Sequence, residues 1–248
     1  IFYSIYAGLS CIPNIITQGG PLGSIICSTQ IDKIGKEMIE REICLYKYKN
    51  NVEIPALAMV DDFCTISKCG VQSVENNAYT ISKFEMFKLE LNSEKCKQIH
   101  IGKNKNCCPN LKTHANIMIK DEEDKYLGDI ISSDCKNDLN IKSRASKSIG
   151  AISEIMSTLQ EVSLRYHYFD MAVLLRSSLF INKILYNSET WYDVMEKDVK
   201  ELEKIDKTLL RRILEAPVST PSELLYLELG VIPLRFIIQA RRLMFLQY

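Results

Sequence analysis

Apolar residues recur at helical spacing in two segments of the first half of the chain. In Leu22–Ile43 and in Val74–Leu89 they return every three or four residues, which places them on one face of a helix. Shorter apolar runs bounded by turn residues are typical of strands. Such runs predict strands at Ile54–Val60, Phe63–Ile66, Gln98–Gly102 and Tyr126–Ile131.

Beyond about residue 136 the apolar pattern is helical throughout. It predicts helices at Ser146–Leu159, Tyr166–Tyr186, Glu196–Leu214 and Arg235–Leu246. Proline-containing breaks interrupt this part at Ala216–Pro221 and Val231–Pro233. We therefore expect an α+β fold in which a mixed domain, 1–135, precedes an all-α domain, 136–248, with the boundary near residues 132–140.

Charge does not decide between classes of partner. Lys and Arg together number 31, as do Asp and Glu, so the net charge is zero. Zero net charge neither supports nor excludes a nucleic-acid partner, because a local basic stripe is enough to neutralise phosphates. A modest basic cluster opens the all-α domain, although such clusters are more often solvated helix faces. Its members, set against Asp138, are Lys136, Lys142, Arg144 and Lys147.

The nine cysteines lie within the first 135 residues, without a Cys-x-x-Cys pair, and the chain has three histidines. No zinc-ligand spacing can be assembled from them, and an odd, scattered set is typical of reduced intracellular thiols. No signal peptide is visible. The apolar segment Met171–Ile181 is interrupted by Arg176 and is too short to span a bilayer. We expect an intracellular protein, in the cytoplasm or nucleus, that is not secreted and has no membrane partner.

Two adjacent acidic residues, Asp61 and Asp62, stand between the predicted strands Ile54–Val60 and Phe63–Ile66. Two carboxylates at the tip of a buried hairpin repel each other and are costly to desolvate. A divalent cation would neutralise them, and hard oxygen ligands suit Mg²⁺. A plain Asp-Asp turn explains the pair equally well, so the segment alone leaves both interpretations open. The acidic run Asp121–Asp124, in contrast, is typical of a solvated loop.

Three weaker constellations accompany this pair. The run Gln18-Gly19-Gly20-Pro21-Leu22-Gly23-Ser24 opens a predicted helix, where free N–H groups favour phosphate or base contacts, although a Gly-Pro turn is the commoner explanation. Lys95 follows a helix exit, and lysines usually point to solvent. The third run is Tyr126-Leu127-Gly128, in which the glycine indicates a bulge or a close approach within a strand.

The order of these blocks is more specific than any one of them. Gln-Gly-x-Pro-Leu-Gly-Ser, then Val-Asp-Asp, then Leu-Asn-x-x-Lys, then Tyr-Leu-Gly resembles the reverse transcriptases of LINE-type (non-LTR) retrotransposons. The tail, Thr220–Gly230 and Ile232–Leu246, is similar to the region after the thumb in those polyproteins. The resemblance covers nearly the whole chain.

The resemblance implies an RNA-directed DNA polymerase that extends a DNA primer on an RNA template with deoxynucleoside triphosphates, by two-metal nucleotidyl transfer. Residues 1–135 would be the C-terminal part of the palm, with antiparallel strands and packed helices, and 136–248 the helical thumb and post-thumb region. Asp61 and Asp62 match the catalytic pair, with Asp61 as the metal ligand, Asp62 as its less direct companion, and two Mg²⁺ ions in the complete palm. The positions that match the nucleotide and template pocket are Gln18, Gly19, Pro21, Leu22 and Lys95. Those that match the primer grip are Tyr126, Leu127 and Gly128.

Two departures from the family matter. Met59 stands where the family often has Tyr or Phe. The family's first catalytic aspartate lies well upstream of the Gln-Gly helix, and Ile1–Ser10 contains no acid. We therefore expect a fragment that lacks the fingers and the N-terminal palm of the same polyprotein and is inactive alone. The alternative is a non-catalytic retroelement remnant that acts as a nucleic-acid-binding or helical interaction module.

Overall fold

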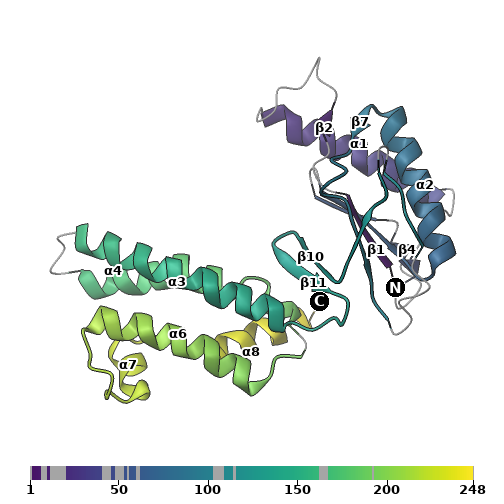
Figure 1. Cartoon of the computed structure of the whole chain (residues 1–248). Helices are drawn as coiled ribbons and strands as arrows, with labels where there is room; N and C mark the ends of the chain where they lie inside the picture. Colours follow the sequence, from purple (N-terminus) through teal and green to yellow (C-terminus); the bar gives the residue numbers. More distant parts are fainter. Residues whose placement is uncertain are drawn as a thin grey trace. The chain divides into compact units, whose positions relative to one another are not determined.

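The computed structural model of the chain contains two compact units, residues 1–135 and 136–248 (Figure 1). The first combines strands and helices and is called the mixed unit; the second is built from helices and is called the helical unit. The chain thus has a mixed α+β fold. The residues that the structure describes are 2–6, 10–11, 21–40, 46–47, 53–54, 56–59, 62–102, 109–113, 116–161, 167–191 and 193–247.

A five-stranded sheet forms the frame of the mixed unit. Its members are β1 (Phe2–Tyr6), β5 (Leu57–Met59), β6 (Asp62–Ser67), β8 (Lys97–His100) and β9 (Ile119–Asp121). They run in the spatial order β5-β6-β1-β8-β9, and only the pair of β8 and β9 is parallel. Strand β1 therefore lies between β6 and β8.

Helices α1 (Pro21–Glu40) and α2 (Gly70–Met86) pack against one face of this sheet. Successive strand residues point to opposite faces, and Phe63 of β6 points toward the helices. Its ring meets the ring of Phe84 of α2 edge-on, with 5.4 Å between the ring centres, and Ile34 of α1 belongs to the same buried core. This core decides which face of β6 is covered by helix.

The predicted helices at Leu22–Ile43 and Val74–Leu89 are confirmed as α1 and α2. The apolar side predicted for α2 is buried only in part: Phe84 lies in the core and Ile81 and Phe87 pack against it, but Val74 is 46% exposed. The side chains that α2 turns inward, apart from Phe84, are polar: Ser73, Asn76, Asn77 and Thr80. Tertiary packing on the sheet has overridden the local pattern here.

A two-stranded hairpin, β10 (Glu123–Tyr126) and β11 (Asp129–Ser132), replaces the single strand predicted at Tyr126–Ile131. The connecting residues, Leu127 and Gly128, both have positive φ, at 48° and 91°, as the two central residues of a type I′ turn require. The prediction of one strand is therefore wrong, because the glycine makes a turn.

Two further pairs of short strands complete the described part of the mixed unit. Strand β2 (Ser10–Cys11) pairs with β7 (Leu89–Glu90). Strand β3 (Tyr46–Lys47) pairs with β4 (Glu53–Ile54). The predicted strand at Ile54–Val60 is thus divided between β4 and β5, while that at Gln98–Gly102 corresponds to β8.

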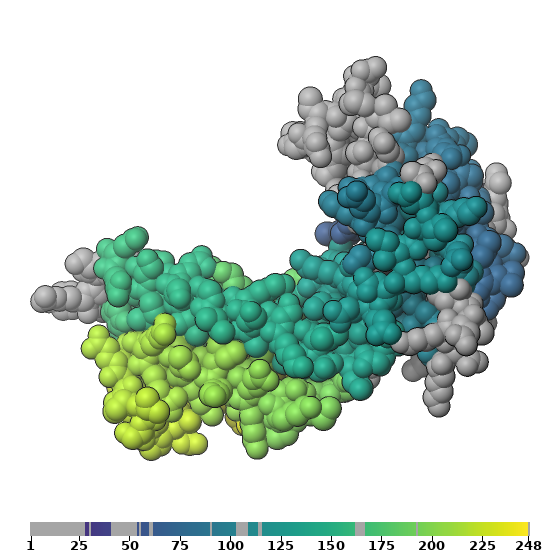
Figure 2. Space-filling view, in the orientation of Figure 1, coloured from purple at the N-terminus to yellow at the C-terminus, as the bar shows by residue number. Residues whose placement is uncertain are grey.

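The helical unit contains helices of three kinds. The α-helices are α3 (Asp138–Glu161), α4 (Tyr168–Leu175), α5 (Asn182–Ile184), α6 (Glu196–Leu214), α7 (Ser222–Glu228) and α8 (Leu234–Phe245). A π-helix, η3 (Arg176–Ile181), joins α4 to α5, and a 3₁₀ turn, η4 (Ser188–Thr190), follows. Helices α3 and α6 lie side by side, and their surfaces meet in the space-filling view (Figure 2).

The main core of the helical unit is a large apolar cluster, and a smaller one contains Leu210, Leu225 and Tyr226. Phe180 of η3 and Trp191 are fully buried in the large cluster, together with Leu202 and Leu209 of α6 and Ile155 of α3. Burial of large side chains from helices far apart in the sequence is the main stabilising term here. The chain's one tryptophan is therefore a reporter for this unit.

The helix predicted at Glu196–Leu214 is confirmed with the same bounds. It begins where the N–H of Met195 donates to Asp198 at 3.1 Å and ends at Glu215, whose φ is 51°. The prediction missed α7, a short helix that begins after Pro221 and ends before Gly230, whose φ is 61°. Within the described part of the chain no helix is both long and apolar enough to cross a membrane.

Candidate functional site

Asp62 is the first residue of β6 and lies opposite Met59 of β5. The sequence analysis placed Asp62 in the turn itself, and this part of the prediction is wrong by one position, because β6 begins at the second acid. The Asp62 side chain is half-buried. Asp61, the other half of the predicted pair, lies outside the described residues.

The alternation of β6 fixes the face on which Asp62 lies. Residues two apart on a strand share a face, so Asp62 and Cys64 point away from the helices that cover Phe63. Cys64 packs there with Ile99 of β8 and Tyr126 of β10. Burial raises the pKa of the Cys64 thiol to about 12, so this cysteine is a packed apolar side chain at neutral pH and no nucleophile.

Tyr126 brings the predicted primer grip to the same face as Asp62. Its side chain is only 9% exposed. Burial is the main cause that raises the pKa of the Tyr126 phenol, and electrostatic interactions with Cys64 and Asp62 raise it further. Among the described residues the Tyr126 hydroxyl has no hydrogen-bond partner. Two predicted site residues from distant blocks of the sequence therefore lie on the same face of the sheet.

A lysine that the sequence analysis overlooked ties the hairpin to this face. Lys97 of β8 lies in register with Cys64 across β1, and its Nζ is 3.0 Å from Asp121 Oδ2 and 3.2 Å from Asp124 Oδ1. The hydrogen bonds that Lys97 donates to these carboxylates raise the pKa of Lys97 and lower the pKa of Asp121. The acidic run Asp121–Asp124 is therefore partly structural and no plain solvated loop.

Of the five predicted nucleotide- and template-binding residues, the structure describes Pro21, Leu22 and Lys95. Lys95 is exposed in the turn before β8, where its N–H donates to the carbonyl of Asn92 at 3.0 Å, and the described contacts do not join it to Asp62. Pro21 and Leu22 are the first two residues of α1, in agreement with proline's preference for the first helical turn. Gln18 and Gly19 lie outside the described residues.

The two turn residues of the predicted primer grip, Leu127 and Gly128, stand at the tip of the hairpin. Leu127 is 42% exposed, although its backbone has a positive φ that a residue with a branched side chain adopts only under constraint. The tip therefore presents an apolar side chain to solvent, while the neighbouring Tyr126 is turned inward.

The donor chemistry of the acid pair suits Mg²⁺, because carboxylate oxygens are the hard ligands that this ion prefers. Asp62 offers one such group, at the first residue of β6. A further carboxylate does not come from the neighbouring strand β1, whose residues are Phe-Tyr-Ser-Ile-Tyr. In the described ranges, which omit Asp61, no group of three or more His, Cys, Asp or Glu side chains could hold a metal ion.

The predicted basic cluster of the helical unit is smaller than its sequence indicated. Arg144 is 7% exposed, and its guanidinium lies 4.3 Å from the centre of the Tyr186 ring, a cation–π contact that holds it inside the unit. Lys136, Lys142 and Lys147 are exposed. The cluster thus offers three lysines, without the arginine.

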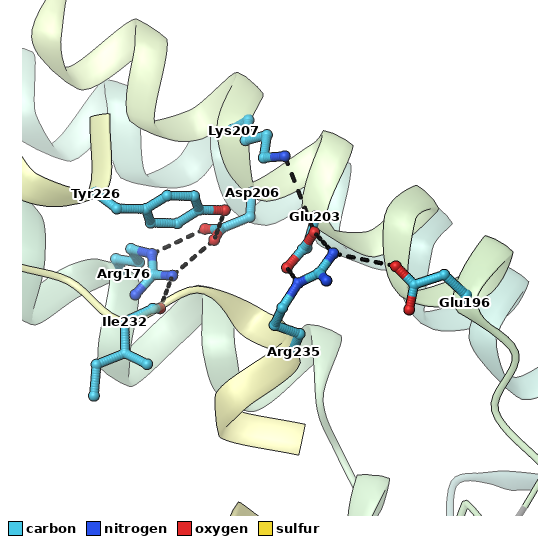
Figure 3. Close-up of polar contacts among 8 residues, drawn as sticks. All are labelled: Arg176, Glu196, Glu203, Asp206, Lys207, Tyr226, Ile232 and Arg235. Atoms are coloured by element: carbon cyan, nitrogen blue, oxygen red, sulfur yellow. Dashed lines mark hydrogen bonds and ion pairs between the residues drawn. The ribbon is translucent and has the colours of Figure 1, made fainter. Parts of the chain in front are cut away.

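A buried polar network in the helical unit was also missed (Figure 3). Arg176, at the start of η3, donates to both carboxylate oxygens of Asp206 on α6, at 2.9 Å and 2.7 Å, and to the carbonyl of Ile232 at 3.2 Å. The hydroxyl of Tyr226 donates to the same carboxylate at 3.3 Å. Burial raises the pKa of Asp206, and the bonds from Arg176 and Tyr226 offset part of that rise.

A second pair lies one turn away on the same helix. Arg235 of α8 donates to both oxygens of Glu203 at 2.8 Å, and it lies 3.4 Å from Glu196. The hydrogen bonds from Arg235 lower the pKa of Glu203. The tail that resembles the LINE post-thumb region therefore supplies Tyr226, the Ile232 carbonyl and Arg235 to carboxylates of α6 (Figure 3).

Neither models of known protein families nor curated proteins match this sequence. The site is therefore interpreted from its own residues. Its defining feature is the sheet face on which Asp62, Cys64 and Tyr126 meet, with Lys97 holding the hairpin strand beside it.

Proposed function

We propose that the chain is part of an RNA-directed DNA polymerase of the LINE type, with part of the palm in the mixed unit and the thumb and post-thumb region in the helical unit. The main support is the sheet face shared by Asp62 and Tyr126. These residues match separate blocks of the family and are far apart in the sequence, yet the phenol lies within the electrostatic influence of the carboxylate. The helices α1 and α2 pack on the opposite face, and the hairpin strand that carries Tyr126 packs on this one.

In the proposed reaction the primer 3′-hydroxyl oxygen bonds to the α-phosphorus of a deoxynucleoside triphosphate, and pyrophosphate leaves with the electrons of the broken P–O bond. Asp61 and Asp62 would hold Mg²⁺, which when bound neutralises phosphate charge and lowers the pKa of the attacking hydroxyl. The template is RNA, and the setting is intracellular. Residues for the nucleotide and template would be Gln18, Gly19, Pro21, Leu22 and Lys95, and those for the primer end Tyr126, Leu127 and Gly128.

We expect this chain to lack polymerase activity by itself, because β1, which neighbours β6, supplies no carboxylate to complete the metal site. The same observation favours a second candidate, a remnant that retains only nucleic-acid binding or helix-mediated interaction. The two candidates differ in whether the acid pair still binds a divalent cation.

Mn²⁺ binding separates the candidates, since Mn²⁺ takes the same oxygen ligands as Mg²⁺ and is detected directly by its electron paramagnetic resonance. Replacement of both Asp61 and Asp62 by Asn should abolish the tightest Mn²⁺ site of the full chain. A matched control replaces the exposed acids Glu122 and Glu123 by Gln, with the same loss of charge, and should bind like the unmodified chain. Equal binding by all three proteins would favour the remnant.

Binding to a labelled RNA–DNA hybrid is the second measurement. We expect fluorescence anisotropy to show an affinity that falls steeply with salt, as release of counterions from phosphates requires, and that is retained when Asp61 and Asp62 are changed to Asn. Primer extension by the unmodified chain with Mg²⁺ and nucleotides should be absent. Extension would contradict the expectation that the active site is incomplete.

A further inference from the structure

Helix α6 of the helical unit carries a row of cations along one face. The cations follow one another at intervals of three or four residues, which places them above each other on the helix surface. The row, called the α6 basic stripe, consists of Lys197, Lys200, Lys204, Lys207 and Arg211. At 1.5 Å per residue the stripe is about 21 Å long. Its first three members are exposed, and the last two are half-buried.

Most acidic side chains of α6 point away from this stripe and into the unit. Three of the five are buried and already paired. Asp206 accepts hydrogen bonds from Arg176, and Glu203 accepts them from Arg235 (Figure 3). Asp198 accepts one from the backbone at the start of the helix. These carboxylates are therefore neutralised by groups other than the stripe.

The stripe consequently carries an excess of positive charge, although the chain as a whole is neutral. Within the described part of the chain, no hydrogen bond or ion pair joins Lys197, Lys200 or Lys204 to another residue. Lys207 lies 4.0 Å from Glu203, whose carboxylate Arg235 already binds. Three lysines on one helix face are thus left for an anion from outside the chain.

The surroundings of the stripe favour a nucleic acid over other polyanions. A helix that binds a membrane surface inserts its apolar face into the lipid, but the apolar face of α6 lies in the core, where Leu202 and Leu209 are fully buried. Protein interfaces are typically poor in lysine and have an apolar centre, whereas the stripe is a row of cations. Lysines in this arrangement suit phosphates, which proteins contact for affinity and not for base sequence.

The composition of α6 also favours a duplex over a single strand. Proteins that bind single strands stack the bases on aromatic side chains, and α6 has no aromatic residue. In a duplex the bases are already stacked, and the phosphates alone face the protein. The length of the stripe matches about six nucleotides of one strand, at 3.4 Å per charge.

We propose that the α6 basic stripe binds the phosphate backbone of a nucleic-acid duplex, with Lys197, Lys200 and Lys204 as the main contacts. The choice of an RNA–DNA hybrid as that duplex rests on the proposed function, but the contact does not involve the acid pair. The binding surface therefore lies on the outer face of α6, and the cluster of Lys136, Lys142 and Lys147 that the sequence singled out is not its centre.

The test replaces Lys197, Lys200 and Lys204 by Gln in the full chain and measures binding to a labelled RNA–DNA hybrid by fluorescence anisotropy. Each neutralised phosphate contributes about 0.9 to the slope of log affinity against log salt, which corresponds to about 8-fold in affinity at about 0.1 M salt. We expect the variant to bind at least about 10-fold more weakly there, with a slope smaller by about three. The loss should be equal on hybrids of two different sequences, because lysines that contact phosphates do not read bases.

Two control variants separate the stripe from general charge. Replacement of the same three lysines by Arg keeps the charge and the helix propensity, so this variant should bind within about twofold of the unmodified chain. Replacement of Lys136, Lys142 and Lys147 by Gln removes the same charge from other exposed positions of the helical unit and should weaken binding less than about threefold. Equal losses in the two Gln variants would show a response to net charge alone and would overturn the proposal.

Two further ligands and one stability measurement complete the test. A loss that is confined to single-stranded RNA, or to vesicles that contain phosphatidylserine, would assign the stripe to that ligand and overturn the proposal. Trp191 fluorescence in urea should give the same unfolding midpoint for all variants, because the replaced lysines have no partner among the described residues. Weaker binding with an equally lowered midpoint would show a structural role and would also overturn it.

The proposal and the proposed function can fail separately. Full hybrid affinity in the Gln variant of α6 would overturn the proposal, because the hybrid would then bind elsewhere on the chain, and the proposed function would stand. The same holds if the unmodified chain binds no hybrid while the acid pair binds Mn²⁺. Loss of the Mn²⁺ site together with retained, stripe-dependent hybrid binding would support the proposal and favour the remnant.

Discussion

Tyr126 in the mixed unit and Tyr226 in the helical unit are alike in surroundings and different in pairing. They are 9% and 8% exposed, and burial together with a nearby aspartate, Asp62 or Asp206, raises the pKa of each phenol. Tyr226 donates to Asp206 at 3.3 Å, whereas the Tyr126 hydroxyl has no partner among the described residues. The hydrogen bond of Tyr226 therefore stabilises the fold of the helical unit, whereas the Tyr126 hydroxyl contributes no such bond to the mixed unit.

The contrast extends to the rest of each unit. The helical unit buries charged groups but pairs them, as Arg176 with Asp206 and Arg235 with Glu203. The mixed unit buries neutral polar side chains between α2 and the sheet, and several of their atoms have no partner within the described ranges. These include atoms of Thr65, Thr80 and Gln98. Buried polar atoms without a described partner occur in the helical unit too, for example Ser188 Oγ and Trp191 Nε1. The difference is that the helical unit pairs its buried carboxylates, Asp206 and Glu203, with arginines.

The largest expected effect comes from opening the buried ion pair of the helical unit by Arg176→Met. Asp206, which is 0% exposed, would keep its carboxylate without a cation, and breaking a buried pair on one side typically costs about 3–5 kcal/mol. Urea unfolding followed by the fluorescence of Trp191, the chain's one tryptophan, measures this unit selectively. The free energy of unfolding should fall by that amount.

The matched control is Lys183→Met, which removes the cation of the ion pair between Lys183 and Glu154. This pair is exposed: 44% of the Lys183 side chain and 52% of the Glu154 side chain are accessible to solvent. Exposed pairs contribute less than about 1 kcal/mol. Equal losses in the two variants would mean that the Arg176 pair is solvated, and the contrast between the units would then disappear.

Glu203→Gln is expected to have the next largest effect, with a characteristic pH dependence. Hydrogen bonds from Arg235 lower the pKa of Glu203 in the folded state, so its carboxylate contributes stability above the unfolded-state pKa. That contribution is lost as the pH falls through the folded-state pKa, which lies below the ordinary value of a glutamate. At pH 7 the variant should lose about 2 kcal/mol, the usual contribution of charged hydrogen bonds.

Trp191 fluorescence in urea at several pH values measures this difference. The gap between Glu203→Gln and the unmodified chain should be widest at neutral pH and close on acidification, because the protonated acid resembles the amide. A gap that stays constant from neutral to acidic pH would show that Arg235 does not hold the ionised form.

The sequence predicted the helices well because their apolar periodicity is long, and α6 has the predicted bounds Glu196–Leu214. It did not predict which groups pair, since Arg176 meets Asp206 and Tyr226 only through tertiary packing. Short elements were predicted less well, because a few residues do not establish a periodicity. The Leu127-Gly128 turn, for example, was interpreted as part of a strand. Strand β1 was not predicted either. Its five residues form a strand through pairing with β6 and β8, which the sequence alone does not show.

The candidate site was predictable in part. The order of motifs selected Asp62 and Tyr126, and the structure places both on one sheet face. Lys97 could not be selected, because its role depends on Asp121 and Asp124 coming within reach. From the sequence, the acidic run Asp121–Asp124 predicts a solvated loop. Its carboxylates reach Lys97 only because β8, β9 and β10 come together in the fold.

A smaller effect, an increase in stability, is expected from a substitution among the buried polar side chains between α2 and the sheet. Gln98 is 0% exposed, and among the described residues neither polar atom of its side chain has a partner. Gln98→Leu should raise the stability of the mixed unit by about 1 kcal/mol, because it removes an unmet desolvation penalty. Asn76→Leu should lower it, since Asn76 donates to Ser67 at 2.9 Å. Pulsed alkylation of Cys96, which is 0% exposed and reports opening of the mixed unit, should be slower and faster, respectively; the same direction in both would contradict the distinction.

The smallest effect is the most direct test of the contrast, because the same chemical change is made at two equally buried positions. Tyr226→Phe removes a donor from Asp206 and should destabilise the helical unit by about 1 kcal/mol, the typical net contribution of a hydrogen bond, as measured by Trp191 fluorescence. Tyr126→Phe removes a donor without a described partner and should leave the mixed unit as stable or up to about 1 kcal/mol more stable, as measured by alkylation of Cys64. Because the ring is retained in both, packing cannot produce opposite signs. If both variants lose stability equally, Tyr126 is paired in solution within the metal-free chain, and its hydroxyl is then a structural group like that of Tyr226.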